Sequence, residues 1–124
     1  MSKFVQVNTQ LRDVAMIKLA LDDLKLRYTE NSTYTHRWSG TSHAVPLAVQ
    51  DGSLSFGLRE TSDGRYEVVG DDMQMRRIQP AINRISQRYA YHMVLAETRS
   101  AGFDLVEESV GKDDVIRMTV RRWR

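Results

Sequence analysis

A long amphipathic helix near the C-terminal end of the sequence constrains the fold more than any other feature. The pattern predicts this helix between Pro80 and Ala101, because proline is tolerated in a first turn and Gly102 favours the left-handed turn that ends a helix. At about 100° per residue, apolar side chains gather on one face: Ile82, Ile85, Tyr89, Met93 and Ala96. Such a helix spans roughly 33 Å at about 1.5 Å per residue, so the rest of the chain is expected to pack along it.

The sequence after this helix predicts a hairpin of two strands: residues 103–110 and 115–123. With the loop at residues 111–114, Glu108 would face Arg117. In the same register Asp104 would face Arg121. Cross-strand pairs of opposite charge contribute roughly 0.2–1 kcal/mol each, so these pairs would stabilise the hairpin and neutralise part of its positive charge.

The first part of the chain is expected to hold one further helix and several short strands. Asp13 is a suitable N-cap for a helix that extends to Leu24, along which apolar residues recur at helical spacing. Pro46 favours an edge position for the strand that contains it. The strands expected before the long helix are these: residues 3–10, 26–29, 44–49, 54–59 and 66–70. A polar loop is expected at residues 30–42, and a linker at residues 73–79.

Together these elements predict an α+β fold in a single domain that covers residues 1–124. We expect an antiparallel sheet of about five to seven strands with two helices packed on one face. The length of 124 residues is close to the commonest domain size. The sequence contains no cysteine, which excludes disulfide bonds and thiolate chemistry.

Hydropathy predicts a protein that does not enter membranes. No segment of the sequence approaches the roughly 20 apolar residues that a membrane-spanning helix needs. The first residues also lack the apolar run of a signal peptide. We therefore expect a soluble, cytoplasmic protein.

Charge is distributed unevenly along the sequence. Residues 1–75 carry eight Lys and Arg against ten Asp and Glu, whereas residues 76–124 carry ten against six. Apart from Lys112, the positive side chains of the second part are all arginines, which suit planar contacts with carboxylate or phosphate groups. This basic half is either a surface for a phosphate-containing partner or a set of structural ion pairs.

The sequence predicts no catalytic residue, no metal site and no cofactor. His36 and His43 stand seven residues apart in the predicted polar loop, a spacing that common zinc motifs do not use, and we expect surface histidines. The neighbours Glu107–Glu108 point to opposite faces of a strand and cannot converge. Tyr89 and His92 have the chemistry of an acid–base pair. Their positions on the core face and at its border favour a packing role instead.

Several short segments share a characteristic order and spacing: Ser2–Phe4, Thr9–Asp13, Leu21–Leu24, Tyr66–Val69, Gln87–His92, Gly102–Phe103, Val106–Glu108 and Val120–Trp123. In these segments the chain resembles the hypothetical chloroplast reading frame thirty-five family. That family is also described as a domain of unknown function, and it is spread through cyanobacteria, algal plastids and some phages. The chain departs from it at Met73–Gln79, where family members usually carry tryptophans and prolines. The resemblance implies a small soluble protein and supplies no catalytic residue.

The outward face of the predicted helix has the composition of a partner-binding surface. Tyrosine and arginine beside aliphatic side chains are typical of interface cores, and this face carries Arg84, Arg88, Tyr91, Val94 and Leu95. We therefore expect a non-enzymatic accessory or adaptor protein that binds another protein, or itself as a homo-oligomer, through the outer face of helix 80–101. Equally, another strand or loop of the same domain could cover this face.

The alternative function is a nucleic-acid-binding module in the basic second half of the chain. An exposed basic strand that ends on an aromatic residue can follow phosphates and stack a base. The residues that would do so are Arg76, Arg77, Arg122, Trp123 and Arg124. The two acidic side chains predicted to face arginines in the hairpin would weaken this positive field.

Overall fold

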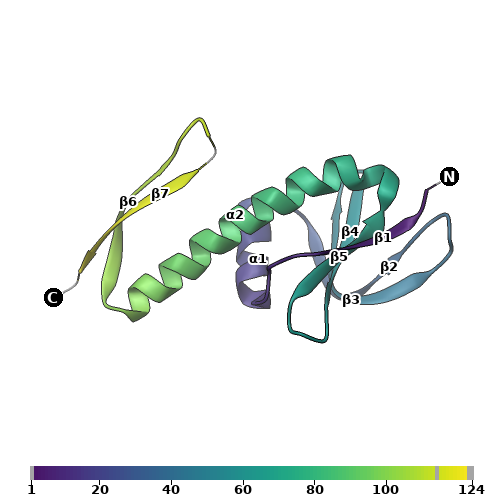
Figure 1. Ribbon diagram of the computed structural model, residues 1–124, viewed down its shortest axis with the longest axis horizontal. Helices are drawn as coiled ribbons and strands as arrows, with labels where there is room; N and C mark the ends of the chain where they lie inside the picture. Colours follow the sequence, from purple (N-terminus) through teal and green to yellow (C-terminus); the bar gives the residue numbers. More distant parts are fainter. Residues whose placement is uncertain (1, 114, 123–124) are drawn as a thin grey trace.

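The protein has an α+β fold in which a five-stranded antiparallel sheet lies against a long helix, and the helix carries a separate two-stranded hairpin (Figure 1). The computed structural model describes residues 2–113 and 115–122. The elements follow in this order: β1 (Phe4–Asn8), α1 (Val14–Asp23), β2 (Tyr28–Thr35), β3 (Ser42–Asp51), β4 (Leu54–Glu60), β5 (Tyr66–Asp71), a 3-10 helix (Asp72–Gln74), α2 (Met75–Ser100), β6 (Phe103–Val110) and β7 (Ile116–Arg122). The strand order is β1-β5-β4-β3-β2 in the larger sheet, and β6 pairs with β7. The predicted fold class is confirmed.

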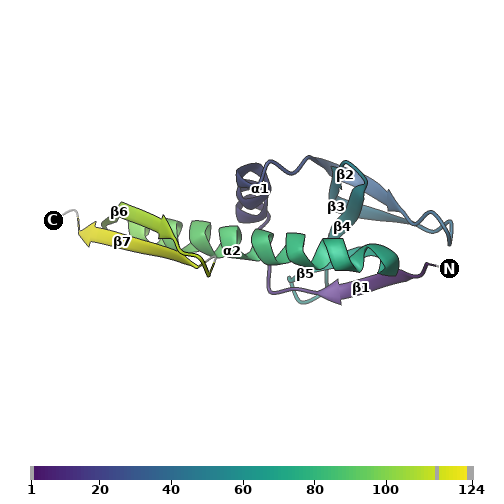
Figure 2. The ribbon, with the colours of Figure 1, turned by 90° about the horizontal axis from the view of Figure 1, so that it is seen from above.

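The main core lies between the two helices and one face of the larger sheet. α1 rests against the middle of α2 in both views of the ribbon (Figure 1 and Figure 2). The fully buried side chains come from both helices and three strands: Ile17, Leu21, Leu47, Val49, Phe56, Leu58, Val68, Ile78 and Ile85. Each such side chain stabilises the fold by roughly 1.5–3 kcal/mol relative to an exposed one.

β2 extends to Thr35, so the predicted loop at residues 30–42 is wrong over about half of its length. Polar residues are accommodated in this strand because it forms an edge of the sheet. Tyr34 is its buried residue. The edge position predicted for Pro46 is also wrong, since β3 pairs with both β2 and β4. The sheet accommodates this proline because the pairing with β2 is interrupted opposite it, where Asn31 has a φ of 49°.

α2 begins at Met75 and runs for 26 residues, so the linker predicted at residues 73–79 is wrong. The carboxylate of Asp71 accepts a hydrogen bond from the backbone N–H two residues on, which caps the 3-10 turn that leads into the helix. Pro80 lies inside α2 and removes one helical donor. The burial of Ile78 in the core offsets the free-energy cost of the missing hydrogen bond, so the helix begins N-terminal to Pro80. No helix in the described part of the chain is both long and apolar enough to cross a membrane.

The hairpin keeps half of its predicted register. Asp104 faces Arg121, as predicted. An irregularity after Leu105 then shifts the pairing by one residue, so the predicted pair of Glu108 with Arg117 is wrong. The shift turns Glu108 towards α2, and Arg117 bonds within the hairpin instead.

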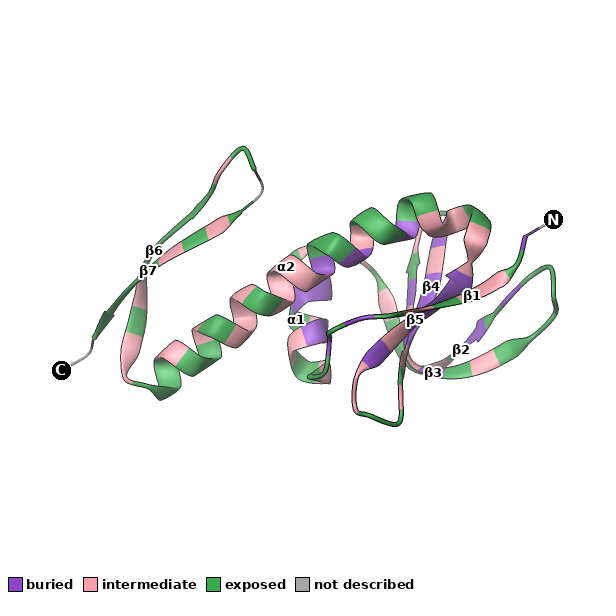
Figure 3. Ribbon diagram, viewed as in Figure 1, coloured by how far each residue is buried: buried purple, intermediate pink, exposed green. Residues whose placement is uncertain are grey.

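The second half of α2 and the hairpin form an arm (residues 86–122) that projects from the rest of the chain, the body (residues 2–85). In Figure 1 the arm continues the long axis of the molecule beyond the sheet. Figure 3 shows the buried segments in the body, and the last buried residue of α2 is Ile85. Of the arm residues whose burial the structure describes, none is buried. The arm is therefore held in place by half-buried contacts alone.

Candidate partner-binding arm

A polar cluster joins the arm to the body, and we call it the junction cluster (Asp23, Arg88, Tyr91, His92 and Glu108). Arg88 Nε donates to Asp23 Oδ2 over 2.9 Å, and His92 Nε2 donates to the same oxygen over 2.6 Å. The guanidinium of Arg88 also lies 3.7 Å from a carboxylate oxygen of Glu108. Its Cζ is 4.3 Å from the centre of the Tyr91 ring, which is a cation–π contact. One arginine therefore links α1, α2 and β6.

Electrostatics favour the ionised form of the Asp23 carboxyl in this cluster. Burial raises its pKa, but hydrogen bonds from His92 and Arg88 more than offset this effect, so the pKa of Asp23 lies below its ordinary value. Burial, followed by the neighbouring Glu108 carboxylate, raises the pKa of Tyr91. The cluster thus pairs its charges internally and acts as a fastening between elements.

Local sequence explains only part of this cluster. Tyr91 and His92 follow Arg88 by three and four residues, so their side chains lie on the same side of α2 as that of Arg88. Their partner Asp23 is 69 residues away from His92 along the chain, and no periodicity could identify it. The cluster joins three of the segments that carry the family resemblance: Leu21–Leu24, Gln87–His92 and Val106–Glu108.

Two mainly apolar grooves run along the arm, one on each side of an exposed part of α2. The first, of about 430 Å³, lies between Met93 and Leu11 of the body. The second, of about 280 Å³, lies between α2 and Ile116 of the hairpin. Ala90 and Val94 border both grooves. The exposed surface between the grooves is therefore continuous and apolar at its centre.

The residues of the predicted partner-binding face have two different environments. Val94 is 44% exposed and stands between the grooves, and Arg84 is also exposed. Arg88 and Tyr91 are half-buried in the junction cluster, and Leu95 is half-buried. The chain itself thus covers one side of the predicted face and leaves the side of Val94 open.

Ala90 and Met93 border this open surface but were not part of the predicted face. The helical period assigns Met93 to the core side of α2, where it would be covered by the sheet. In the structure the sheet ends before this turn of the helix, so Met93 is only half-buried and borders a groove. Periodicity defines the face of a helix but does not show how far along the helix a core extends.

The basic residues of the nucleic-acid alternative lie far apart. Arg76 and Arg77 are in the first turn of α2, and Arg122 ends β7 at the opposite end of the long axis (Figure 1). Trp123 and Arg124 lie outside the described residues. Arg76, Arg77 and Arg122 therefore do not form one basic patch.

His36 is 1% exposed, so the prediction of a surface histidine is wrong. Its Nδ1 accepts hydrogen bonds from the Ser39 N–H and hydroxyl, and its Nε2 therefore carries the proton and donates to Asp71 over 3.0 Å. The order serine, histidine, aspartate is that of a hydrolytic triad. The Ser39 hydroxyl, however, is also bonded to the N–H and hydroxyl of Thr41, so its hydrogen bonds are made within its own loop. The group fixes the β2–β3 loop to the end of β5.

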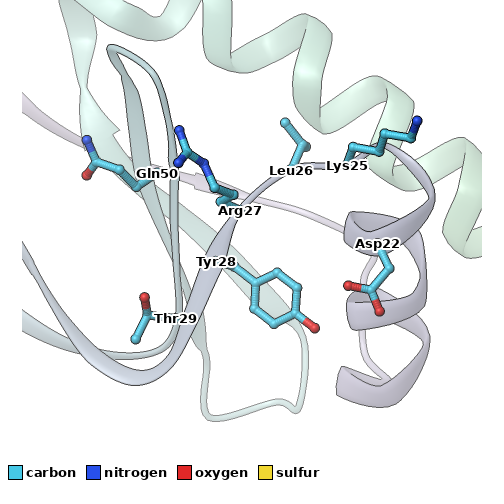
Figure 4. A pocket seen from close by; sticks show the side chains of 7 residues that line it. All are labelled: Asp22, Lys25, Leu26, Arg27, Tyr28, Thr29 and Gln50. Carbon is cyan, nitrogen blue, oxygen red and sulfur yellow. The ribbon is translucent and has the colours of Figure 1, made fainter.

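A wide hollow of about 730 Å³ lies between α1 and β2 (Figure 4). The ring of Tyr28 turns towards Asp22, whereas Lys25 and Arg27 point the other way (Figure 4). Burial and the Asp22 carboxylate raise the pKa of Tyr28. The charged groups do not converge on one point, and no three metal-ligating side chains of the described residues gather anywhere in the chain.

Comparison with known proteins agrees with the resemblance seen in the sequence. The family described as "Protein of unknown function (DUF1257)" matches residues 20–119. The "Uncharacterized protein ycf35" of Pyropia yezoensis is 30% identical over 99% of this chain and 98% of its own length. The proteins with the same name from Cyanophora paradoxa and Guillardia theta are each 27% identical over 100% of this chain and 99% of theirs. No solved structure matches. The chain belongs to the DUF1257 family of proteins of unknown function.

Proposed function

We propose that this protein is a non-enzymatic accessory protein that binds a second protein chain through the arm. The observation that carries the proposal is the exposure of an apolar surface along half of a long helix. Val94 is 44% exposed, and the neighbouring Met93, Leu95 and Ile116 are half-buried. Contiguous apolar surface of this kind marks interaction sites in proteins.

The arm contains little internal apolar packing, since none of its residues whose burial the structure describes is buried. A two-stranded hairpin is marginally stable by itself in water and needs a packed face. The face of this hairpin rests on α2, but Phe103, Leu105 and Met118 stay half-buried there. A partner that covers the grooves would supply the missing apolar contacts.

The junction cluster supports the same function because it sets the arm in one orientation. Arg88 is tied to α1 by a 2.9 Å hydrogen bond to Asp23 and lies 3.7 Å from Glu108 of the hairpin. A surface that is rigid before binding loses less conformational entropy when its partner docks. The polar residues of the junction cluster thus hold the apolar surface of the arm in one orientation before a partner binds.

Site-specific photo-crosslinking in the native host tests this proposal. A photoreactive amino acid in place of Val94, between the grooves, is expected to give covalent adducts with a protein chain. The matched control carries the same amino acid in place of Ala96, which is exposed on α2 but borders neither groove. The proposal is supported if position 94 gives protein adducts and position 96 gives few. It is refuted if position 94 gives no adduct with a protein.

A further inference from the structure

We propose that the arm binds a second copy of this chain, with α2 packed antiparallel against α2 about a two-fold axis at Ala90. The inference rests on the proposed function, since it names the partner of the same surface. The contact is centred on a ridge formed by Ser86, Ala90 and Val94, which follow one another at intervals of four residues along α2. We call these three residues the arm ridge.

The exposed surface of the chain is larger than that of a compact monomer of the same mass. The chain exposes 8081 Å², whereas a folded monomer of its mass of 14.3 kDa exposes about 6,800 Å². The excess is about 1,300 Å². Obligate homodimers bury about 1,000–2,500 Å² on each partner. The elongated shape produces this excess, and its size is within the range that one subunit covers in a stable dimer.

The shape of the arm fits a second helix. Ser86 and Ala90 have small side chains, so another helix can approach the backbone of α2 closely at this point. The groove of about 430 Å³ on one side and the groove of about 280 Å³ on the other can receive the larger side chains of that helix. Val94 is the exposed side chain that would enter a groove of the partner.

The polar residues beside the arm ridge select an antiparallel arrangement. With the axis at Ala90, Asn83 lies opposite Glu97 of the partner subunit, because both are seven residues from the axis. The side-chain oxygen of Asn83 accepts a hydrogen bond from Gln79 over 3.0 Å, which leaves its amide N–H groups to donate to that carboxylate. In a parallel arrangement Glu97 would instead lie beside the same carboxylate of the other copy, and the two would repel.

A second copy is a better match to this surface than an unrelated chain. A partner that covers the apolar surface of the arm would complete its packing. A second copy of the chain is always available for this, because both copies are made in the same place. The three residues of the arm ridge are neutral, and so are the neighbouring Gln87 and Met93. No charge at the centre of the contact would therefore meet the same charge of a second copy. Two-fold symmetric dimers, in which one patch meets itself, are the commonest protein oligomers.

Disulfide trapping tests the geometry without interference, because the natural sequence has no cysteine. Under mild oxidation the purified Ala90→Cys variant is expected to form a disulfide-linked dimer, since the two positions meet on the axis. The matched Ala96→Cys variant is expected to stay monomeric on a non-reducing gel. An equimolar mixture of Asn83→Cys and Glu97→Cys is expected to link preferentially as a mixed dimer. Failure of Ala90→Cys to link, or equal linking of Ala96→Cys, overturns the inference.

Sedimentation equilibrium measures the association itself. The unmodified chain is expected to have twice its mass of 14.3 kDa at micromolar concentration. Ala90→Arg places two guanidinium groups together on the axis and is expected to weaken association more than about 100-fold, whereas Ala96→Arg is expected to leave it unchanged. Circular dichroism checks that both variants fold. An unmodified chain that stays monomeric at about 100 µM overturns the inference. If position 94 still crosslinks to a different protein in the host, the proposed function stands and only the identity of the partner fails.

Discussion

Asp23 connects the two helices because one of its carboxylate oxygens accepts hydrogen bonds from both Arg88 and His92. The same arginine lies close to Glu108, so the loss of one carboxylate would leave a half-buried guanidinium with a weaker set of partners. Hydrogen bonds to charged groups are each worth roughly 1.5–3 kcal/mol when they are buried, and less when they are partly solvated. At the scale of single residues, this cluster is where the arm is most sensitive to substitution.

Replacement of Asp23 by Asn is expected to reduce the free energy of unfolding by about 1–2 kcal/mol at pH 7, because Arg88 and His92 lose their ionised hydrogen-bond acceptor. Urea unfolding followed by circular dichroism measures the loss. Glu107→Gln is the matched control, since Glu107 is exposed on the neighbouring hairpin. An equal loss of unfolding free energy in the two variants would show that the hydrogen bonds of the junction cluster add nothing to the effect of removing one negative charge.

The pH dependence of the same variants follows from the lowered pKa of Asp23. Because this pKa is lower in the folded chain than in the unfolded one, the carboxylate stabilises the fold above the unfolded value of about 3.9. This contribution to the free energy of unfolding is lost as the pH falls through the lower pKa that Asp23 has in the folded chain. The stability difference between the unmodified chain and Asp23→Asn is therefore expected to shrink below about pH 4. A difference that stays constant down to about pH 2 would contradict this account.

α2 is one continuous helix that lies in two environments, and this is the main feature at the scale of elements. Its first half has its apolar stripe in the core, where Ile78, Ile82 and Ile85 are buried. Its second half continues the stripe with Tyr89 and Met93, which are half-buried. The same pattern thus stabilises the fold in one half and offers a binding surface in the other.

Alanine substitutions in the two halves are expected to differ in cost. In the Ala90→Arg background, where association does not contribute, Ile85→Ala is expected to lower the free energy of unfolding by about 2–5 kcal/mol. Met93→Ala is expected to cost less than about 1.5 kcal/mol, since its side chain is already partly in water. Chemical denaturation of both variants gives the comparison. Equal costs would mean that the arm is packed as tightly as the body.

At the scale of the whole molecule, the chain is elongated, with the sheet and the hairpin at opposite ends of α2 (Figure 1 and Figure 2). This shape creates the large exposed area and also separates the basic residues. Arg76 lies at the sheet end and Arg122 at the hairpin end. Nucleic-acid affinity depends on many phosphate contacts made together, and it falls steeply with salt.

A mobility-shift assay with single- and double-stranded DNA is therefore expected to show no stable complex even at about 50 mM salt. A shift that persists at this salt concentration and disappears in Arg76→Ala and Arg122→Ala variants would favour the nucleic-acid alternative. A lysine-rich protein of similar mass serves as a positive control for non-specific binding.

Features that depend on neighbouring residues could be predicted from the sequence. The apolar period of the long helix, the cap at Asp13 and the alternation in β4 predict elements that the structure confirms. The sequence predicts only the first residues of the polar strand β2, because its side chains face water at a sheet edge, where alternation carries little signal. The earlier start of α2 was missed because the burial of Ile78 depends on the sheet below it.

The sequence alone determined the fold class, the family and the direction of the helical face, because these follow from spacing and composition. Only the tertiary structure decided which part of that face is covered. The irregularity after Leu105 turns Glu108 towards Arg88, and the end of the sheet leaves Met93 only half-buried. Both outcomes depend on contacts between residues that are distant in the chain. The physical reason is that periodicity records which side of a helix is apolar, whereas burial depends on what the rest of the fold places there.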